Sequence, residues 1–275
     1  MELEIITIYC VNEEFLRAIN YKDDPQSVMT TAEVMTTAFV AACYYSGNHE
    51  RSRDFLREHG YIPRMLSKSQ FNRRLHSIPV EVWQSFLELL AQIAHSSNPL
   101  KTYLIDSFPL PVCQNIRIKR CRIYQEEEFR GWNESKKQYF YGLKVHLLVS
   151  ETGIPVELLL SPGNYSDTSS LYDFPFNLPE GAYVHGDKAY NVYEVEDQLD
   201  EEKQIHLRPI RKKNSQRNYD FSFAKGIRYV RKRIESTFSC IQQWFPKHIH
   251  AVTHTGFELK ILLFILTYGI HAAIL

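Results

Sequence analysis

Three acidic residues lie where a metal site for phosphodiester chemistry would need them. Asp106 follows the apolar segment 103–105 and Asp187 follows 183–186, and both segments predict short β-strands. Ligands collect at strand ends in an open α/β sheet, so the two carboxylates are expected to meet there. Carboxylate oxygens select Mg²⁺ or Mn²⁺, and a pair of such ions can generate an attacking hydroxide and stabilise the leaving oxygen.

Glu235 is the predicted third carboxylate. A helix is expected over 223–243 because apolar residues recur there at helical spacing. The buried stripe consists of Ile227, Val230, Ile234, Phe238 and Ile241. Glu235 flanks this stripe, and Arg228 and Arg231 precede it on the same flank. Arg231 is thereby expected to hold a phosphate through two parallel hydrogen bonds, with Arg228 beside it.

Each carboxylate also has an ordinary structural interpretation. An Asp at a strand end commonly caps a turn, and Glu235 would form a helical ion pair with Arg231. Asp167 in the segment PGNYSD and Glu157 in the strand PVELLL are competing acids. These alternatives stay open on the residues alone.

Basic and imidazole side chains surround the predicted site. Lys144 and His146 alternate with apolar residues, so they share one strand face, which either meets the site or is solvated. His185 lies two residues before Asp187 on the same side, and Lys188 follows it. His185 and His146 are candidates to support a metal ligand by hydrogen bonding. The alternative for His185 is a structural, hydrogen-bonded histidine.

Residues 50–76 fit a helix–turn–helix. Ser67 and Gln70 form a capping box at the start of its second helix, which buries Phe71 and Leu75. The outward side chains are expected to be Asn72, Arg73, Arg74 and His76. Asn and Arg read base edges in the DNA major groove. The alternative is an ordinary helical bundle with a charged outer face.

Charge and cysteine content narrow the class further. The formal net charge is zero, but residues 206–233 carry ten Lys or Arg against one acid, directly after the acidic stretch 194–202. Such segregation can steer a polyanion to one face. Five scattered cysteines without a CxxC pair indicate reduced thiols and a cytoplasmic protein rather than a zinc or disulfide framework.

The periodicity changes near residue 100. In residues 1–98 the apolar residues recur at helical spacing, which predicts an all-helical DNA-binding domain. Residues 99–275 begin with three strands and continue with alternating helix and strand, which predicts an α/β domain with a mixed sheet. This element order is that of the RNase H-like fold. The apolar run 261–275 is too short for a bilayer span and is expected to be a buried helix, so no membrane is predicted.

The chain resembles the DDE-type transposases of bacterial insertion sequences, in particular the nine-eighty-two group. The segments that carry the resemblance, in the family's order, are LSKSQFNRRLH (66–76), IDSFP (105–109), YFYGLKVHLLVS (139–150), GIPVELLLSPGNYSDTSSL (153–171), HGDKAYN (185–191) and RYVRKRIESTFSCIQQWF (228–245). They cover most of the chain.

The resemblance implies an RNase H-like catalytic domain in which Asp106, Asp187 and Glu235 bind two Mg²⁺ ions, or Mn²⁺. It implies an enzyme that cuts double-stranded DNA at the element's terminal inverted repeats and joins the freed 3′-hydroxyls to target DNA. A DNA-bound homodimer in the bacterial cytoplasm, associated with the nucleoid, is expected. The expected DNA contacts are Arg73, Arg74, Lys144, Lys188, Arg228 and Arg231.

The sequence departs from the Tyr-Arg-Glu-Lys signature of neighbouring insertion-sequence groups. Arg231 and Glu235 match, but Arg228 stands at the Tyr position and Gln242 at the Lys position, so those two roles are not carried over. Two rival functions stay open. One is a catalytically silent, transposase-derived DNA-binding protein, and the other is a metal-dependent nuclease of the same fold that does not join strands.

Overall fold

The computed structural model describes residues 1–134, 136–212, 214–219 and 221–275; the side chains at 221–225, 227, 228 and 231 lie outside the described residues. The described chain forms two compact units. The helical unit comprises Met1–Leu89, Trp244–Ala251 and Thr255–Leu275, and the sheet unit comprises Leu90–Gln243 and Val252–His254. This division differs from the boundary expected at residue 98, because the C-terminal helix groups with the N-terminal helices.

The helical unit is built from amphipathic and fully buried helices. They are α1 (Glu2–Ala18), α2 (Thr31–Tyr44), α3 (His49–Glu58), α4 (Lys68–His76), the first part of α5 (Val80–Ser96) and nearly all of α9 (His254–Ala273). The capping box expected at Ser67 and Gln70 is confirmed: Ser67 Oγ accepts from Gln70 N, and the Gln70 side chain accepts from Ser67 N. Local sequence thus sets where α4 begins.

Helices α2 and α9 supply much of the core of this unit. Eleven of the residues of α2 are buried, and α9 buries ten, between Phe257 and Ile270. By length and composition, α9 is also the one helix among the described residues that could cross a membrane, yet 56% of its apolar window is buried inside the protein. A core helix explains this burial, in agreement with the buried helix expected over 261–275.

The sheet unit contains one mixed sheet. Its strands are β1 (Thr102–Pro111), β2 (Arg130–Asn133), β3 (Gln138–Ser150), β4 (Pro155–Pro162), β5 (Tyr183–His185) and β6 (His206–Leu207). Their order is β2-β3-β1-β5-β6, with β4 also paired to β3. Strand β3 is antiparallel to β1, β2 and β4, whereas β5 is parallel to β1 and β6. The expected mixed α/β architecture is confirmed.

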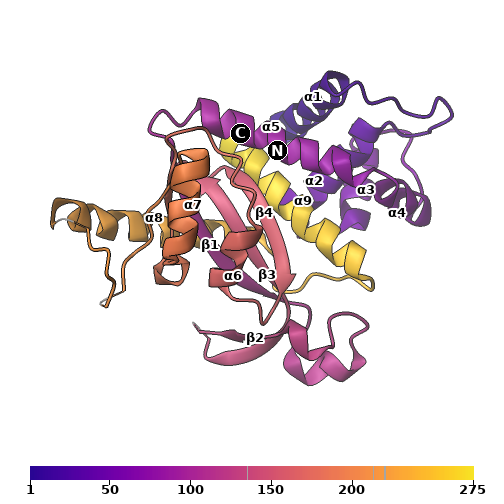
Figure 1. Ribbon diagram of the computed structural model, residues 1–275. Helices are drawn as coiled ribbons and strands as arrows, with labels where there is room; N and C mark the ends of the chain where they lie inside the picture. The colour runs from indigo at the N-terminus through magenta and orange to yellow at the C-terminus, as the bar shows by residue number, and fades with distance from the viewer. Residues whose placement is uncertain (135, 213, 220) are drawn as a thin grey trace. The chain divides into compact units, whose positions relative to one another are not determined.

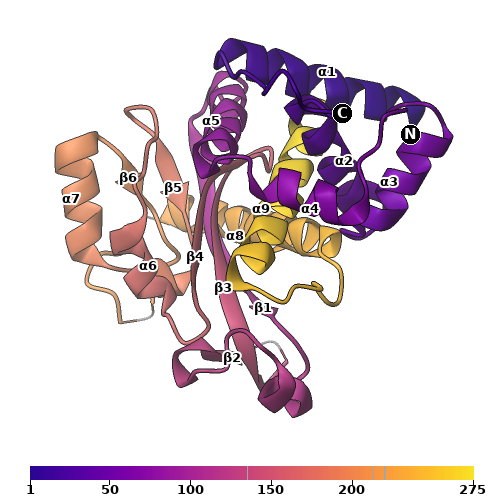
Figure 2. The ribbon, with the colours of Figure 1, turned by 90° about the vertical axis from the view of Figure 1, so that its right-hand side faces the viewer.

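Helices cover both faces of this sheet. Figures 1 and 2 show α6 (Asp167–Asp173) and α7 (Tyr193–Lys203) on one face and α8 (Phe221–Trp244) on the other. Short 3₁₀ turns complete the unit: η1 (Asn115–Arg120), η2 (Glu127–Phe129) and η3 (Lys188–Tyr190). Successive residues of a strand point to opposite faces, so adjacent positions on β1 can serve the α8 face and the α6 face separately.

Candidate active site

The three carboxylates selected from the sequence face one cavity in the sheet unit. The cavity has a volume of about 230 Å³. Its lining residues are Asp106, Asp187, Lys188, Ile210, Ile234 and Glu235. Acids from a central strand, a strand end and a helix are therefore brought to the same space, with one lysine among them.

The parallel pairing of β1 and β5 explains how the two aspartates meet. Leu104 on β1 is in register with His185 on β5, and each aspartate lies two residues beyond its member of this pair. The strand end expected at Asp106 is wrong, because β1 continues past it to Pro111. Strand β5 ends at His185, so Asp187 lies just beyond the last β1–β5 pair and beside Asp106 of β1, and both line the same cavity. Gly186 permits the close approach, since a Cβ there would lie 2.9 Å from Ile105 Cγ2.

Backbone hydrogen bonds orient both aspartates. Ser107 N donates to Asp106 Oδ1 at 2.8 Å, and Ala189 N donates to Asp187 Oδ1 at 2.6 Å. Asp187 is the N-cap of η3, which ties its carboxylate to the start of that turn. The aspartates are thus held by adjacent backbone rather than by flexible side chains.

Burial and neighbouring carboxylates disfavour the ionised form of Asp106. Burial raises its pKa to about 7, opposed by the hydrogen bond from Ser107 N and reinforced by the carboxylates of Asp187, Asp167 and Glu235. Clustered carboxylates repel each other, and a divalent cation relieves that repulsion.

Glu235 lies beside the part of the expected α8 stripe that is buried; Val230 of that stripe is half-buried, and the Ile227 side chain lies outside the described residues. Ile234, Phe238 and Ile241 are buried, and Glu235 is the exposed neighbour of Ile234. Arg228 and Arg231, expected on the same flank, have side chains outside the described residues. Their predicted phosphate contacts therefore stay predictions.

The donor set fits a hard divalent cation in its chemistry and location. Three carboxylate side chains face one cavity, and such oxygens are the ligands that Mg²⁺ and Mn²⁺ take. Within the described part of the chain, no three His, Cys, Asp or Glu side chains gather closely enough to enclose one ion. Glu235, which is exposed and has the longest of the three side chains, is the group able to adjust by rotation.

The basic residues expected around the site divide into two groups. Lys188 is exposed and lines the cavity. Lys144 does not line it: Lys144 Nζ donates to Tyr165 O at 2.8 Å and lies 3.3 Å from Asp167 Oδ1. The Lys144 side chain is only 17% exposed, so it is neither solvated nor directed at the three acids.

The two histidines considered as supports for metal ligands have other partners. His146 is fully buried and its Nε2 lies 2.8 Å from Ser161 Oγ. Burial lowers the pKa of His146 to about 4, while the charge of Asp167 opposes this shift. His185 Nδ1 lies 3.2 Å from Arg208 O, which matches the structural alternative for this residue.

The two competing acids are engaged elsewhere. Glu157 accepts hydrogen bonds from the backbone N–H groups of Phe176 and Asn177, so it anchors the chain before β5. Asp167 Oδ1 accepts from Ser107 Oγ at 2.6 Å and pairs with Lys144. The sequence named Asp167 only as a possible ligand, and its contact with the residue next to Asp106 depends on a tertiary pairing that local patterns do not contain.

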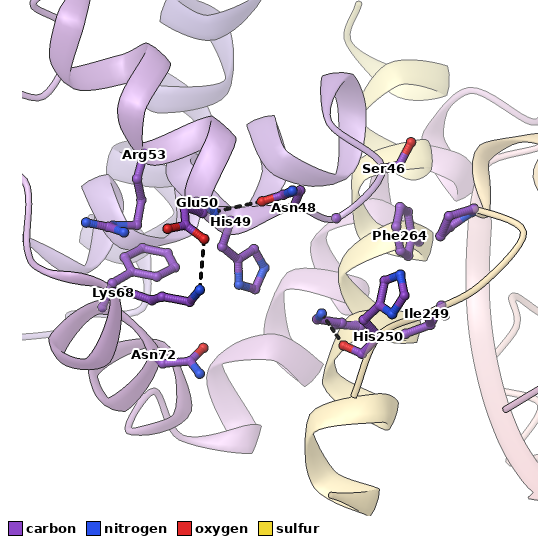
Figure 3. Close-up of a pocket in the computed structure, with 14 residues that line it drawn as sticks. Ser46, Asn48, His49, Glu50, Arg53, Lys68, Asn72, Ile249, His250 and Phe264 are labelled. Carbon is purple, nitrogen blue, oxygen red and sulfur yellow. Dashed lines mark hydrogen bonds and ion pairs between the residues drawn. The ribbon is translucent and has the colours of Figure 1, made fainter. Parts of the chain in front are cut away.

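A second cavity lies in the helical unit, and Asn72 is the member of the face expected to read DNA that lines it. It measures about 350 Å³ and is lined on one side by α3 and α4 and on the other by 246–250 and α9. Figure 3 shows His49 and Asn72 from the first wall and His250 and Phe264 from the second. Its lining includes several side chains that can donate hydrogen bonds, among them Arg53, Lys68, Asn72 and Lys260.

The contacts of Lys68 and Arg74 differ from those expected for a helix–turn–helix with an outward basic face. Lys68 Nζ pairs with Glu50 at 2.8 Å, across the cavity rim. Arg73 is exposed, as expected, but the outward orientation expected for Arg74 is wrong. Arg74 is half-buried and donates to Asp23 Oδ1 at 2.5 Å and to Thr31 Oγ1 at 2.7 Å, because α4 packs against the start of α2. The connection between α3 and α4 spans 59–67, longer than a usual helix–turn–helix turn.

Comparison with protein families supplies the class of the protein. The family model described as a transposase DDE domain matches residues 96–256, which is more than half of the chain and includes all three acids. The chain therefore belongs to the transposase DDE domain family. No curated protein matches it.

Proposed function

We propose that the protein is a DNA transposase of the nine-eighty-two type that cuts at the terminal inverted repeats of an insertion sequence and joins the freed ends to target DNA. The observation that carries the proposal is the shared cavity of Asp106, Asp187 and Glu235 within the family match. The antiparallel β1–β3–β4 strands and the parallel β5 beside β1 support an RNase H-like assignment for the sheet unit.

Asp106, Asp187 and Glu235 are the proposed ligands of two Mg²⁺ or Mn²⁺ ions. When bound, such ions lower the pKa of a water nucleophile and stabilise charge on the leaving oxygen. Within this arrangement, the backbone N–H groups of Ser107 and Ala189 fix the orientation of the two aspartates. Lys188 on the cavity wall places a positive charge where a DNA phosphate would lie.

The helical unit is the proposed site of end recognition. Lys68, Asn72 and Lys260 line its cavity, and Arg73 is exposed beside it on α4. Lys260 is half-buried, and its described contact is a hydrogen bond to His250 O at 2.5 Å, which leaves donor capacity for a phosphate oxygen. Action as a homodimer on double-stranded DNA, in the cytoplasm and close to the nucleoid, is part of the same proposal, as are contacts from Arg228 and Arg231.

Cleavage of a DNA carrying candidate inverted repeats tests the proposal. The wild-type protein with Mg²⁺ is expected to nick the repeat end and transfer the strand to a second DNA. Asp106→Asn is expected to bind the end but to cut it at least about 100-fold more slowly, because a metal ligand is lost. Glu201→Gln, which removes an exposed carboxylate from α7, is the matched control and should cut normally.

Each rival function has its own outcome in this experiment. Binding without cutting by the wild type would indicate a catalytically silent DNA-binding protein. Cutting without strand transfer would indicate a nuclease of the same fold. Normal cutting by Asp106→Asn would remove Asp106 from the site.

A further inference from the structure

Two hydrogen-bond chains run from the first turn of α6 to the two aspartates of the sheet unit. In the first chain, Ser107 N donates to Asp106 Oδ1 and Ser107 Oγ donates to Asp167 Oδ1, at 2.8 and 2.6 Å. Ser107 and Asp106 are successive strand residues, so their side chains point to opposite faces. Asp167 therefore holds β1 from behind Asp106.

The second chain has the same construction on the neighbouring strand. Thr168 Oγ1 donates to Ala189 O at 2.9 Å, and Ala189 N donates to Asp187 Oδ1 at 2.6 Å. Thr168 directly follows Asp167, and both belong to the start of α6. The first turn of α6 is thus hydrogen-bonded to Ser107 and to Ala189, the two residues whose backbone N–H groups orient Asp106 and Asp187.

The start of α6 is itself firmly anchored. Ser166 caps the helix by accepting from Ser169 N at 3.0 Å. Asp167 Oδ1 lies 3.3 Å from Lys144 Nζ and 3.7 Å from His146 Nδ1, both on β3. Because β3 pairs with β1 through this region, α6 is tied to the centre of the sheet.

We propose that Asp167 and Thr168 are positioning residues that set the spacing of Asp106 and Asp187 for divalent-metal binding, a role that rests on the proposed metal site. Two carboxylates at one cavity repel each other and would separate unless their backbones are held. Metal ligands need placement within roughly 0.5 Å, which supporting hydrogen bonds provide. Asp167 does not line the cavity of the three acids, so its contribution passes through Ser107.

Thr168→Val tests the second chain with little risk to folding. Valine keeps the shape of the exposed Thr168 side chain and removes only its hydroxyl. Mn²⁺ binding to the intact protein, measured by the electron paramagnetic resonance of free Mn²⁺, is expected to weaken by up to about 10-fold. This is the lower end of the cost of losing a hydrogen bond to a metal ligand, because Thr168 acts on Asp187 through Ala189. Thr168→Ser should restore wild-type binding. Asp167→Ala should weaken Mn²⁺ binding in the same way through the first chain.

Tyr172→Phe is the matched control, because it removes an exposed hydroxyl from the same helix and should leave Mn²⁺ binding unchanged. Folded Thr168→Val protein that binds Mn²⁺ as tightly as the wild type would overturn the role of Thr168, and a wild type that binds no Mn²⁺ would overturn the whole positioning proposal. Mn²⁺ binding that depends on Thr168, in a wild type that cuts no DNA, would instead contradict the transposase activity and support the positioning role.

Discussion

At the scale of single residues, His49 is the titratable group with the clearest consequence for stability. It begins α3 and lines the cavity of the helical unit. Burial, and after it the charges of Lys260, His76 and Arg53, lower the pKa of His49 to about 4 from an ordinary value of 6.5. Between these two pH values the unfolded chain binds more protons than the folded protein, so stability falls as the pH is lowered through this window.

We expect the wild type to lose stability between pH 6.5 and pH 4 more steeply than His49→Gln, because one proton gives a slope of at most about 1.4 kcal/mol per pH unit. Urea unfolding across this range measures the difference. His59→Gln, at an exposed histidine that follows α3, should keep the wild-type slope. Parallel curves for the wild type and His49→Gln would show that His49 does not control the acid response.

The three acids selected from local sequence patterns all line one cavity of the sheet unit. Asp187 was selected because a strand end can be read from an apolar run, and Glu235 because it flanks a periodic stripe. Asp106 was selected for the same reason as Asp187, but it lies inside β1 and shares the cavity because β5 ends beside it. Lys144 was expected either to meet the site or to be solvated, and Arg74 was expected to point outward. Both are instead paired with acids distant in sequence, Asp167 and Asp23. Such long-range pairs leave no trace in periodicity, so they could not be predicted from the sequence.

At the scale of elements, β2 and the turn after β4 pack with their backbones in contact. A Cβ at Gly131 would lie 2.1 Å from Gly163 O, and one at Gly163 would lie 2.4 Å from Phe129 O. Gly131→Ala is therefore expected to destabilise the protein by about 1–3 kcal/mol through overpacking. Gly226→Ala, on α8 with no atom within 4 Å of the added carbon, should instead add up to about 1 kcal/mol of helix stability. Thermal unfolding measures both, and equal effects would contradict the contact.

Strand β1 shows why element lengths were harder to predict than element types. The sequence indicated a strand only to Ile105, whereas β1 continues to Pro111 through two prolines. Val112 N donates to Tyr141 O on β3, so by alternation the nitrogens of Pro109 and Pro111 point to the other side. On that side β5 pairs only as far as Leu104, and no ladder bond is lost. The partner strands, which the sequence does not reveal, decide where β1 can end.

At the scale of the whole molecule, the helical unit draws on both ends of the sequence. Helix α9 contributes buried residues to it, and Phe264 of α9 lies against Gly47. A fragment of residues 1–98 therefore lacks part of its core and is expected to show no cooperative thermal unfolding by circular dichroism. The chain ending at Ala273 is the control and should unfold cooperatively. A cooperative transition in the fragment would show that the N-terminal helices form a core alone.

The grouping of α9 with the first helices also orders events during synthesis. Domains usually fold as they emerge, and about 5–20 residues are made per second, so α9 follows Leu89 by roughly 10–40 s. During that interval the sheet unit leaves the ribosome, while the helical unit still lacks the buried apolar residues of α9. A newly made chain should thus form the cavity of the three acids before the cavity of the helical unit, which needs residues 246–250 and α9. Chaperones are expected to bind helices α1 to α4 during this interval.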